Sequence, residues 1–171
     1  RQNPALKLWI MGPDDEDETY PGECRQLVGA LHAENIVFTG PIQTAEYIGK
    51  MDMTLLTSIS EGQPLTVLES FAARRPVIAT NVGNCKGLIY GETDDFGEAG
   101  IVAPVLNVTQ ISQAILKLAG DAQLRRRMGD AGYKRLRRMY TIGDMVAAYD
   151  AIFKRVAGGS GKAGVYSVWL A

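Results

Sequence analysis

The sequence predicts an α/β protein built on a doubly wound parallel sheet. Short apolar runs of β-forming residues alternate along the chain with longer segments of helical periodicity, which is the order that strands and crossover helices produce. The apolar runs are continuous rather than alternating, and continuous runs are typical of strands buried on both faces. In such sheets ligands bind beyond the carboxyl ends of the strands.

The elements follow one another as strand–helix units. The expected strands are residues 6–11, 36–39, 53–56, 76–80 and 100–103. The expected helices are residues 22–33, 44–50, a helix opening at Pro64, and three closing helices at 108–120, 122–140 and 142–156. Gly-Pro pairs follow the first two strands and end them. In the first helix the residues that share one face are Cys24, Leu27, Val28 and Leu31.

Length and composition favour one globular domain. The chain has 171 residues, of which 46% are hydrophobic and 22% charged, and such a length buries a sizeable core without disulfides or metal. We expect the domain to span residues 1–157 and a Gly-rich linker and tail to occupy residues 158–171. The net charge of -1 argues against nucleic acid or an anionic membrane as a partner.

Cysteine and histidine usage excludes further site classes. Cys24 and Cys85 are far apart and only His32 could add a nitrogen ligand, so we expect no zinc site and no disulfide framework. We expect packing thiols, a reducing cytoplasmic location and no membrane-spanning segment. The chain begins at Arg1 without an initiating Met, which suggests a fragment.

The segment from Thr57 to Ala72 carries the most chemical information, because it joins a strand to a helix. Pro64 suits the first helical turn, where its missing N–H costs nothing. Leu65, Leu68 and Ala72 recur at helical spacing and are expected to form the buried stripe. The free amides of the first turn and the positive end of the helix dipole would then face a ligand, which favours an anion.

Two carboxylates flank this helix start. Glu69 lies one turn past Leu65, about 6 Å along the axis, and a carboxylate can accept two hydroxyl hydrogen bonds from a ribose. Glu61, in the preceding loop, could do the same for a sugar beyond the phosphates. Acidic residues near a helix start are also common because they offset its dipole, so the spacing alone leaves both interpretations open.

A family resemblance adds to this reading. Glu61 and Glu69, with seven residues between them, look like the E-x7-E motif of family 4 retaining glycosyltransferases with the GT-B fold. The similarity covers about residues 5–155, including the strand ends at 9–13 and 37–40 and the passage from 71 to 83 into a glycine turn. Within the family, residues 12–17 and 57–61 most resemble the enzymes of Pel exopolysaccharide synthesis.

The resemblance implies a role for each matching position. Glu61, the residue assigned to catalysis, would hold hydroxyls of the transferred sugar and would not act as a nucleophile. Glu69 would hold the ribose, and Gly40 and Pro41 would lie along the base. The diphosphate of a nucleoside diphosphate sugar, with UDP favoured, would be held by the loop and helix start, that is, by Gly62, Gln63, Pro64, Leu65 and Thr66. The transfer would retain the anomeric configuration without a metal or other cofactor.

The sequence also departs from that family. A glycine is usual where Arg74 or Arg75 stands, so we expect the helix to end differently. The Rossmann-like donor-binding half of the GT-B fold normally opens with a further strand and helix carrying an Arg and a Lys, and this chain starts after them. The resemblance therefore implies a missing amino-terminal domain, a glycan acceptor and possible membrane-complex partner proteins. We expect the 171-residue chain alone to transfer nothing and to bind a nucleotide sugar weakly, if at all.

The remaining features are expected to be structural. The basic residues 125–127, 134–135 and 137–138 indicate a solvated helical face over buried Leu124, Met128, Ala131 and Leu136. The acidic run 14–18 lacks the ligand spacing of a calcium loop. The turn Gly83-Asn84-Cys85-Lys86 is either a plain turn or a backbone approach to the ligand.

Two other functions stay open: half of a nucleotide-sugar 2-epimerase, and a noncatalytic α/β interaction module.

Overall fold

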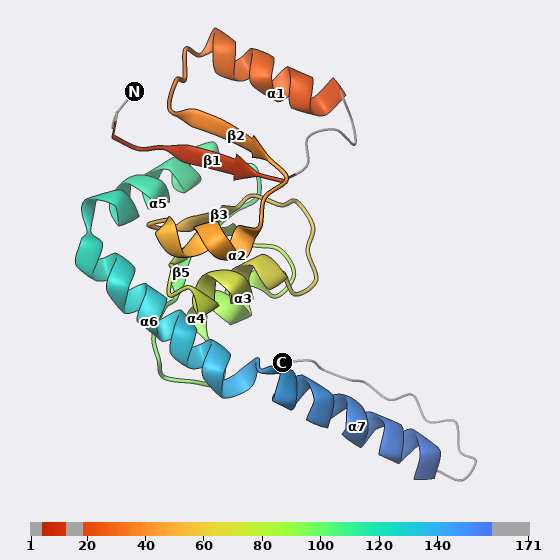
Figure 1. Cartoon of the computed structure of the whole chain (residues 1–171). Helices are drawn as coiled ribbons and strands as arrows, with labels where there is room; N and C mark the ends of the chain where they lie inside the picture. Colours follow the sequence, from red (N-terminus) through yellow and green to blue (C-terminus); the bar gives the residue numbers. More distant parts are fainter. Residues whose placement is uncertain (1–4, 13–18, 159–171) are drawn as a thin grey trace.

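The computed structural model describes residues 5–12 and 19–158 of the chain, so the acidic run 14–18 and the tail after residue 158 lie outside it. Its strands form two parallel sheets, β1-β2 and β3-β4-β5. The strands are β1 (Leu8–Met11), β2 (Ile36–Gly40), β3 (Thr54–Leu56), β4 (Val77–Thr80) and β5 (Gly100–Ala103). This arrangement, with helices between successive strands (Figure 1), confirms the α/β prediction.

The helices also follow the expected order, with one addition. They are α1 (Thr19–Ala30), α2 (Thr44–Tyr47) with the 3-10 turn η1 (Ile48–Lys50), α3 (Leu65–Ala72), α4 (Cys85–Tyr90), α5 (Val108–Gly120), α6 (Ala122–Met139) and α7 (Ile142–Gly158). Helix α1 starts three residues earlier than expected and ends three residues earlier. Helix α4 is the addition: Cys85 and Lys86, which the sequence places in the turn after β4, form its first residues.

Strand β4 is the centre of the core. Every residue of β4 is buried, and its side chains alternate between the two faces. Val77 and Ala79 belong to the cluster that includes Phe71 and Leu88. Ile78 belongs to a second cluster with buried residues of α5 and α6. The predicted burial on both faces is therefore confirmed for β4.

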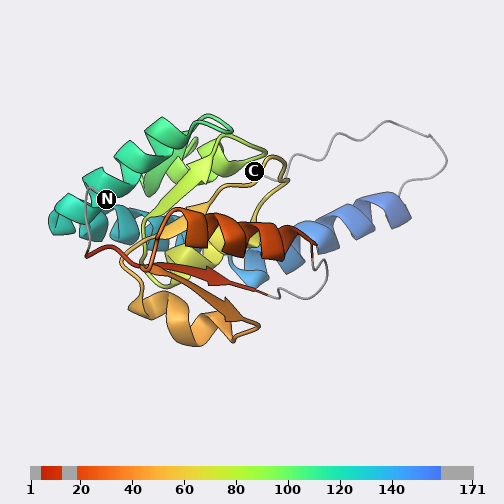
Figure 2. The same ribbon diagram turned by 90° about the horizontal axis from the view of Figure 1, so that it is seen from above.

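Strand β1 does not follow that prediction. Leu8, Trp9 and Ile10 are 39%, 36% and 41% exposed, although the run is continuously apolar. Among the described residues β1 pairs only with β2, and the two strands lie to one side of the larger sheet with α1 beside them (Figures 1 and 2). The expectation of two-sided burial was wrong here because neighbouring elements, rather than apolar composition, decide how much of a strand is covered.

Helix α3 buries a face that overlaps the expected one only at Leu68, which is partly buried and packs against the core. Leu65 is 70% exposed and Ala72 is exposed, whereas Val67, Ser70 and Phe71 are buried. The i, i+3, i+4 spacing fits more than one apolar stripe of a short helix. Contact with β4 and α6 determines which of these stripes is buried. Gly132 of α6 permits that contact, because a Cβ there would overlap the Phe71 ring.

The end of α3 explains one departure from the family pattern. Arg74 has φ +55, a left-handed conformation that glycine adopts at lower cost. The amide of Arg74 donates to the Phe71 carbonyl at 3.0 Å and that of Arg75 to the Ser70 carbonyl at 2.8 Å, which together form a Schellman motif. The helix therefore ends as a glycine-capped helix would, with arginine in the glycine's place.

Arg135 corrects the prediction of a fully solvated basic face on α6. Its side chain is completely buried and forms an ion pair with Asp94, 2.7 Å from Nε to Oδ2. It also donates to the carbonyls of Leu88, Ile89 and Gly97 at 2.7–3.0 Å. The hydrogen bonds that Arg135 donates to the Asp94 carboxylate lower the pKa of Asp94 below its ordinary value. Arg135 is thus a core residue that ties α6 to α4.

Helix α7 leaves the body of the protein (Figures 1 and 2). Its exposed large apolar side chains are Ile142, Met145, Val146, Tyr149, Phe153 and Val156. The helix continues to Gly158, the first residue of the predicted linker. Within residues 5–12 and 19–158, neither α7 nor any other helix combines the length and apolar character that a bilayer crossing requires.

Candidate functional site

The candidate site lies at the carboxyl ends of the strands. The chain passes from β1 to β2 in one sheet and then to β3, β4 and β5 in the other. In Figure 1 the strands β1 and β2 point toward the side of the molecule where the loop after β3 lies. A change in the direction of winding at the carboxyl edge of parallel strands is where α/β proteins bind ligands.

The start of α3 is open. Pro64 is the N-cap residue, with φ -70 and ψ 120, so it precedes the helix rather than forming its first residue as expected. Among the described residues no side chain caps this end. Pro64 is buried, whereas Gln63, Leu65 and Thr66 are exposed. The first amides and the positive end of the helix dipole thus lie at the surface, where an anion could reach them.

A buried hydroxyl pair fixes α3 on the sheet. Thr54 Oγ1 of β3 donates to Ser70 Oγ at 2.8 Å, and Ser70 Oγ donates to the Thr66 carbonyl at 2.7 Å. Ser70 is fully buried, so these bonds satisfy its hydroxyl where water cannot. The bonds anchor the first turns of α3 to the strand that precedes the candidate loop.

Glu61 is held by its own loop. Ser58 Oγ donates to Glu61 Oε1 at 2.7 Å, and Thr80 Oγ1, at the end of β4, donates to the Ser58 carbonyl at 2.5 Å. Thr80 is buried and Glu61 is partly buried. One carboxylate oxygen of Glu61 is thus directed by a hydroxyl that the neighbouring strand holds in place.

The loops after β3 and β4 are in direct backbone contact. The Asn84 amide donates to the Gly62 carbonyl at 2.8 Å. Gly83 has φ +49, and a Cβ at this position would overlap the carbonyl oxygens of both Glu61 and Gly62. The turn at residues 83–86 is therefore more than a plain turn: its backbone approaches the Glu61 loop.

Cys85 lies behind these loops. It is fully buried, and burial raises the pKa of its thiol above the ordinary value, with a further rise from the nearby Glu61 carboxylate. Cys24 and Cys85 are both free. Cys85 is therefore a neutral packing thiol at physiological pH, as its sequence context predicted.

The other predicted residues lie in helix α3 and at the end of strand β2. Glu69 is exposed in the second turn of α3. Gly40 ends β2 with φ +65 and accepts a bond from the Gly12 amide at 3.2 Å, and Pro41 follows it. The structure brings Glu61 and Gly62 together with Gly83, whereas Gly40 ends β2 of the smaller sheet and Pro41 follows it. Their roles toward a ligand stay predictions.

Two residues of this cluster were not predicted. Ser58 stands three positions before Glu61, and a hydroxyl at that spacing is a recognisable local signal for a loop hydrogen bond. Thr80 carries no such signal, because its partner comes from a loop 22 residues away. The contact of Gly83 with Glu61 and Gly62 likewise depends on the sheet order and not on local sequence.

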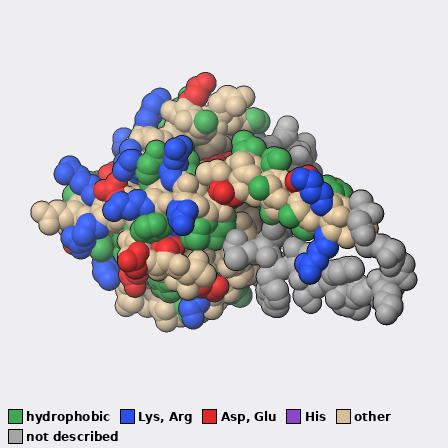
Figure 3. Space-filling view, turned by 90° about the horizontal axis from the view of Figure 1, so that it is seen from below, with side chains coloured by type: hydrophobic (Ala, Val, Ile, Leu, Met, Phe, Trp, Pro, Cys, Tyr) green, Lys and Arg blue, Asp and Glu red, His purple; other side chains and the backbone are tan. Residues whose placement is uncertain are grey.

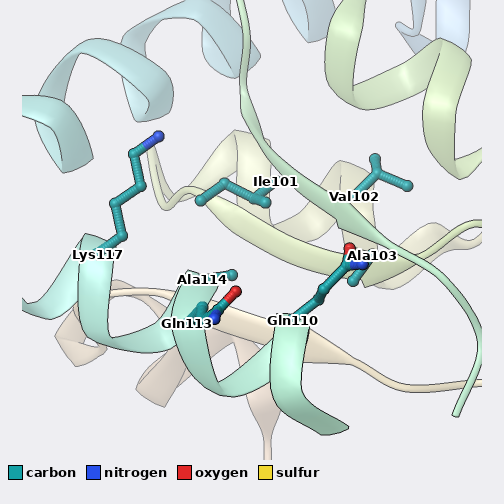
Figure 4. Close-up of a pocket in the computed structure, with 7 residues that line it drawn as sticks. All are labelled: Ile101, Val102, Ala103, Gln110, Gln113, Ala114 and Lys117. Carbon is teal, nitrogen blue, oxygen red and sulfur yellow. The ribbon is translucent and has the colours of Figure 1, made fainter. Parts of the chain in front are cut away.

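A hollow of about 340 Å³ lies elsewhere, between β5 and α5 (Figure 4). Its lining residues are Ile101, Val102, Ala103, Gln110, Gln113, Ala114 and Lys117. None of them belongs to the predicted site. Gln110, Gln113 and Lys117 are exposed, so the hollow presents polar side chains to solvent rather than buried groups to a ligand.

The surface and the acidic groups offer little else. Figure 3 shows Lys and Arg side chains dispersed over one face among acidic, apolar and other groups. Across the part of the chain that the structure describes, no three His, Cys, Asp or Glu side chains gather as a metal site would require.

The parallel strands and the helices between them define a Rossmann-like α/β domain. Comparison with known families is more specific, since residues 1–121 match the model of the family described as "Glycosyl transferases group 1". This match covers most of the chain, and the chain therefore belongs to that family.

Individual relatives agree with this assignment. The chain is 29% identical over 130 residues, or 75% of its length, to N-acetyl-alpha-D-glucosaminyl L-malate synthase of Bacillus anthracis, of which it covers 33%. It is similar in fold to sucrose-phosphate synthase from Thermosynechococcus elongatus, with a TM-score of 0.82, 21% identity, and coverage of 93% of this chain and 40% of that one. For Anabaena HepE in complex with UDP-glucose the values are 0.75, 17%, 92% and 42%. The chain thus spans a third to two fifths of these proteins.

Proposed function

We propose that the chain is the donor-binding half of a retaining glycosyltransferase that moves a sugar from a nucleoside diphosphate sugar to a glycan acceptor. The observation that carries the proposal is the open start of α3 beside the fixed Glu61 carboxylate. Both features stand at the carboxyl edge of the strands, in a chain of the group 1 glycosyltransferase family.

Each part of a donor would meet matching chemistry. The exposed first turn of α3, with the Gly62–Pro64 loop before it, offers amides and a helix dipole to the diphosphate. Stabilising the charge that develops on the departing diphosphate is a preorganised electrostatic task. Glu61 would accept hydroxyls of the transferred sugar, and the exposed Glu69 would accept those of the ribose.

The finer features of the activity belong to the proposal as well. We assign UDP as the nucleotide, because HepE, which shares the fold, has been solved with UDP-glucose. Retention of configuration rests on the E-x7-E resemblance, a cytoplasmic location on the cysteine usage, and service in Pel-type exopolysaccharide synthesis on the likeness of residues 12–17 and 57–61. The transfer would need no metal or cofactor, since the helix start and a basic pair can neutralise the diphosphate.

That basic pair would come from a missing amino-terminal part of the protein. Among the described strands, β1 pairs only with β2 and β3 only with β4, so each of the two is an edge strand of its sheet. A further parallel strand between β1 and β3 would join the two sheets and pair the free backbone groups of both strands. The reading frame upstream of Arg1 would show whether such a strand, its Arg and Lys, and an acceptor domain exist.

Titration of the 15N-labelled 171-residue chain with UDP, followed by NMR up to millimolar concentration, tests the donor site. We expect weak, saturable binding with shifts concentrated at the amides of Gly62, Gln63, Leu65 and Thr66. Glu69→Ala should weaken UDP binding about tenfold, because a hydrogen bond to a charged group contributes about 1.5–3 kcal/mol. No transfer is expected from this chain alone.

Glu98→Ala is the matched control. Glu98 is exposed and precedes β5, so it stands at the amino ends of the strands, opposite the candidate site. The variant should bind UDP as the parent does. The absence of saturable shifts in the parent, or shifts that avoid residues 62–66, would remove the proposed donor site.

A further inference from the structure

We infer that the turn after β4 is the positioning element for the Glu61 carboxylate, with Gly83 and Thr80 as its positioning residues. The inference rests on the proposed function, because it concerns how that site is set for the transferred sugar. It adds two residues that lie outside the E-x7-E segment and outside the loop that carries Glu61.

The first support is the chain of hydroxyl bonds. Thr80 Oγ1 donates to the Ser58 carbonyl at 2.5 Å, and the hydroxyl of the same Ser58 donates to Glu61 Oε1 at 2.7 Å. Thr80 is 1% exposed, so its hydroxyl has no water with which to exchange that bond. The orientation of Glu61 therefore depends on the end of β4, 19 residues farther along the chain.

The second support is the backbone contact made by Gly83. A Cβ at Gly83 would overlap the carbonyl oxygens of Glu61 and Gly62, so any other residue would displace the loop or the turn. The adjacent Asn84 amide donates to the Gly62 carbonyl at 2.8 Å. The close approach of Gly83 and the hydrogen bond from Asn84 together fix the position of the Glu61 loop relative to the turn.

The turn is itself well fixed. The Asn81 amide donates to the Ala103 carbonyl of β5 at 2.8 Å, and Cys85 and Leu88 of α4 are fully buried. The carbonyls of Leu88 and Ile89 accept from the buried Arg135. A loop with exposed residues at 59, 60, 62 and 63 thus rests on a rigid neighbour, which is how an active-site carboxylate gains a defined orientation.

Gly97 supplies a matched control for Gly83. It also has a positive φ, +92, but a Cβ at Gly97 would meet no atom within 4 Å among the described residues. Gly83→Ala and Gly97→Ala both add backbone strain, whereas only the former pushes on the Glu61 loop. Thr80→Val removes the hydroxyl at nearly constant shape, and Thr80→Ser retains it.

The experiment measures UDP and UDP-glucose binding to the 171-residue chain by NMR. Glu61 is assigned to the transferred sugar, which UDP lacks. Thr80→Val should therefore lower UDP-glucose affinity about tenfold while UDP affinity changes less than twofold. Gly83→Ala, which also pushes on the Gly62 carbonyl of the proposed diphosphate loop, should lower the affinity for both nucleotides. Thr80→Ser and Gly97→Ala should bind both nucleotides as the parent does. Equal losses for UDP and UDP-glucose in Thr80→Val would overturn the positioning role.

Amide shifts without ligand separate this inference from the proposed function. Gly83→Ala and Thr80→Val should move the amides of residues 58–62, and Gly97→Ala should leave them in place. If the parent binds neither nucleotide, the proposed function fails and these shifts alone decide the positioning role. Unmoved 58–62 amides in Gly83→Ala and Thr80→Val would overturn it.

Discussion

Strands β1 and β4 are both four residues long and belong to parallel sheets, yet they have opposite environments. β1, with the sequence LWIM, is the more apolar and is exposed along most of its length; β4, with the sequence VIAT, is buried at every position. β4 has a strand on each side and clusters of apolar residues on both faces. The difference shows that cover by neighbouring elements, and not the strand's own composition, determines burial.

The largest expected effect concerns the stability of the part of the protein built around the β3-β4-β5 sheet. Arg135→Met leaves the nearly buried Asp94 carboxylate unpaired and removes the donors of three carbonyls, so we expect a loss of about 3–5 kcal/mol of unfolding free energy. Urea denaturation of the parent and variant measures it. Arg138→Met, on the exposed face of the same helix, should cost less than about 0.5 kcal/mol.

Lowering the pH should reduce the difference in unfolding free energy between the parent and Arg135→Met. The Asp94 pKa is lowered in the folded protein, so its contribution is present above the ordinary carboxyl pKa of about 4 and is lost as pH falls through the lowered value. If Arg135→Met loses less than about 1 kcal/mol of unfolding free energy at neutral pH, the buried ion pair does not stabilise the part of the protein built around the β3-β4-β5 sheet.

A matched pair of isoleucines compares the two sheets directly. Ile78→Ala removes a side chain that is 0% exposed, and Ile10→Ala one that is 41% exposed. We expect losses of about 2–4 kcal/mol for Ile78 and below about 1 kcal/mol for Ile10. Urea denaturation at two protein concentrations measures both losses and excludes self-association. Equal losses would mean that β1 is as well covered in solution as β4.

The smallest effect concerns the left-handed residue at the end of α3. Arg74→Gly relieves about 1 kcal/mol of strain. It also removes a 2.5 Å ion pair with Asp130, whose partners are both more than half exposed, and the contact with the Tyr133 ring, worth about 0–1 and 0.5–1 kcal/mol. We expect a net change within about 1 kcal/mol in thermal or urea unfolding. A gain above about 2 kcal/mol would show that Arg74 is mainly a source of strain.

Local sequence patterns predicted helices and strands well where the pattern is compatible with only one secondary structure. Helix α5 and strand β5 begin and end at the predicted residues, because their apolar periodicity and flanking turns are unambiguous. The pattern was insufficient where tertiary contacts chose among alternatives. Leu65 fits a helical stripe as well as Val67 does, and only the position of β4 and α6 buries Val67 and leaves Leu65 exposed.

The candidate site shows the same division. The sequence predicted the loop, the helix start and the two glutamates, since strand–loop–helix chemistry is local. It could not predict that Thr80 would reach Ser58 or that Gly83 would contact Glu61, because both depend on which strands are neighbours. It also placed Arg135 among solvated cations, since nothing in the sequence of α6 identifies the Asp94 carboxylate and three carbonyls that surround it.

The partial exposure of Trp9 has a practical consequence. Its ring lies in β1, 6.0 Å from the ring of Tyr47, at the open edge of the smaller sheet. The chain has one other tryptophan, Trp169, so a Trp169→Phe protein emits from Trp9 alone. Its emission wavelength is then an intrinsic optical gauge of this edge, and a blue shift would register the arrival of any chain segment that shields the indole from water.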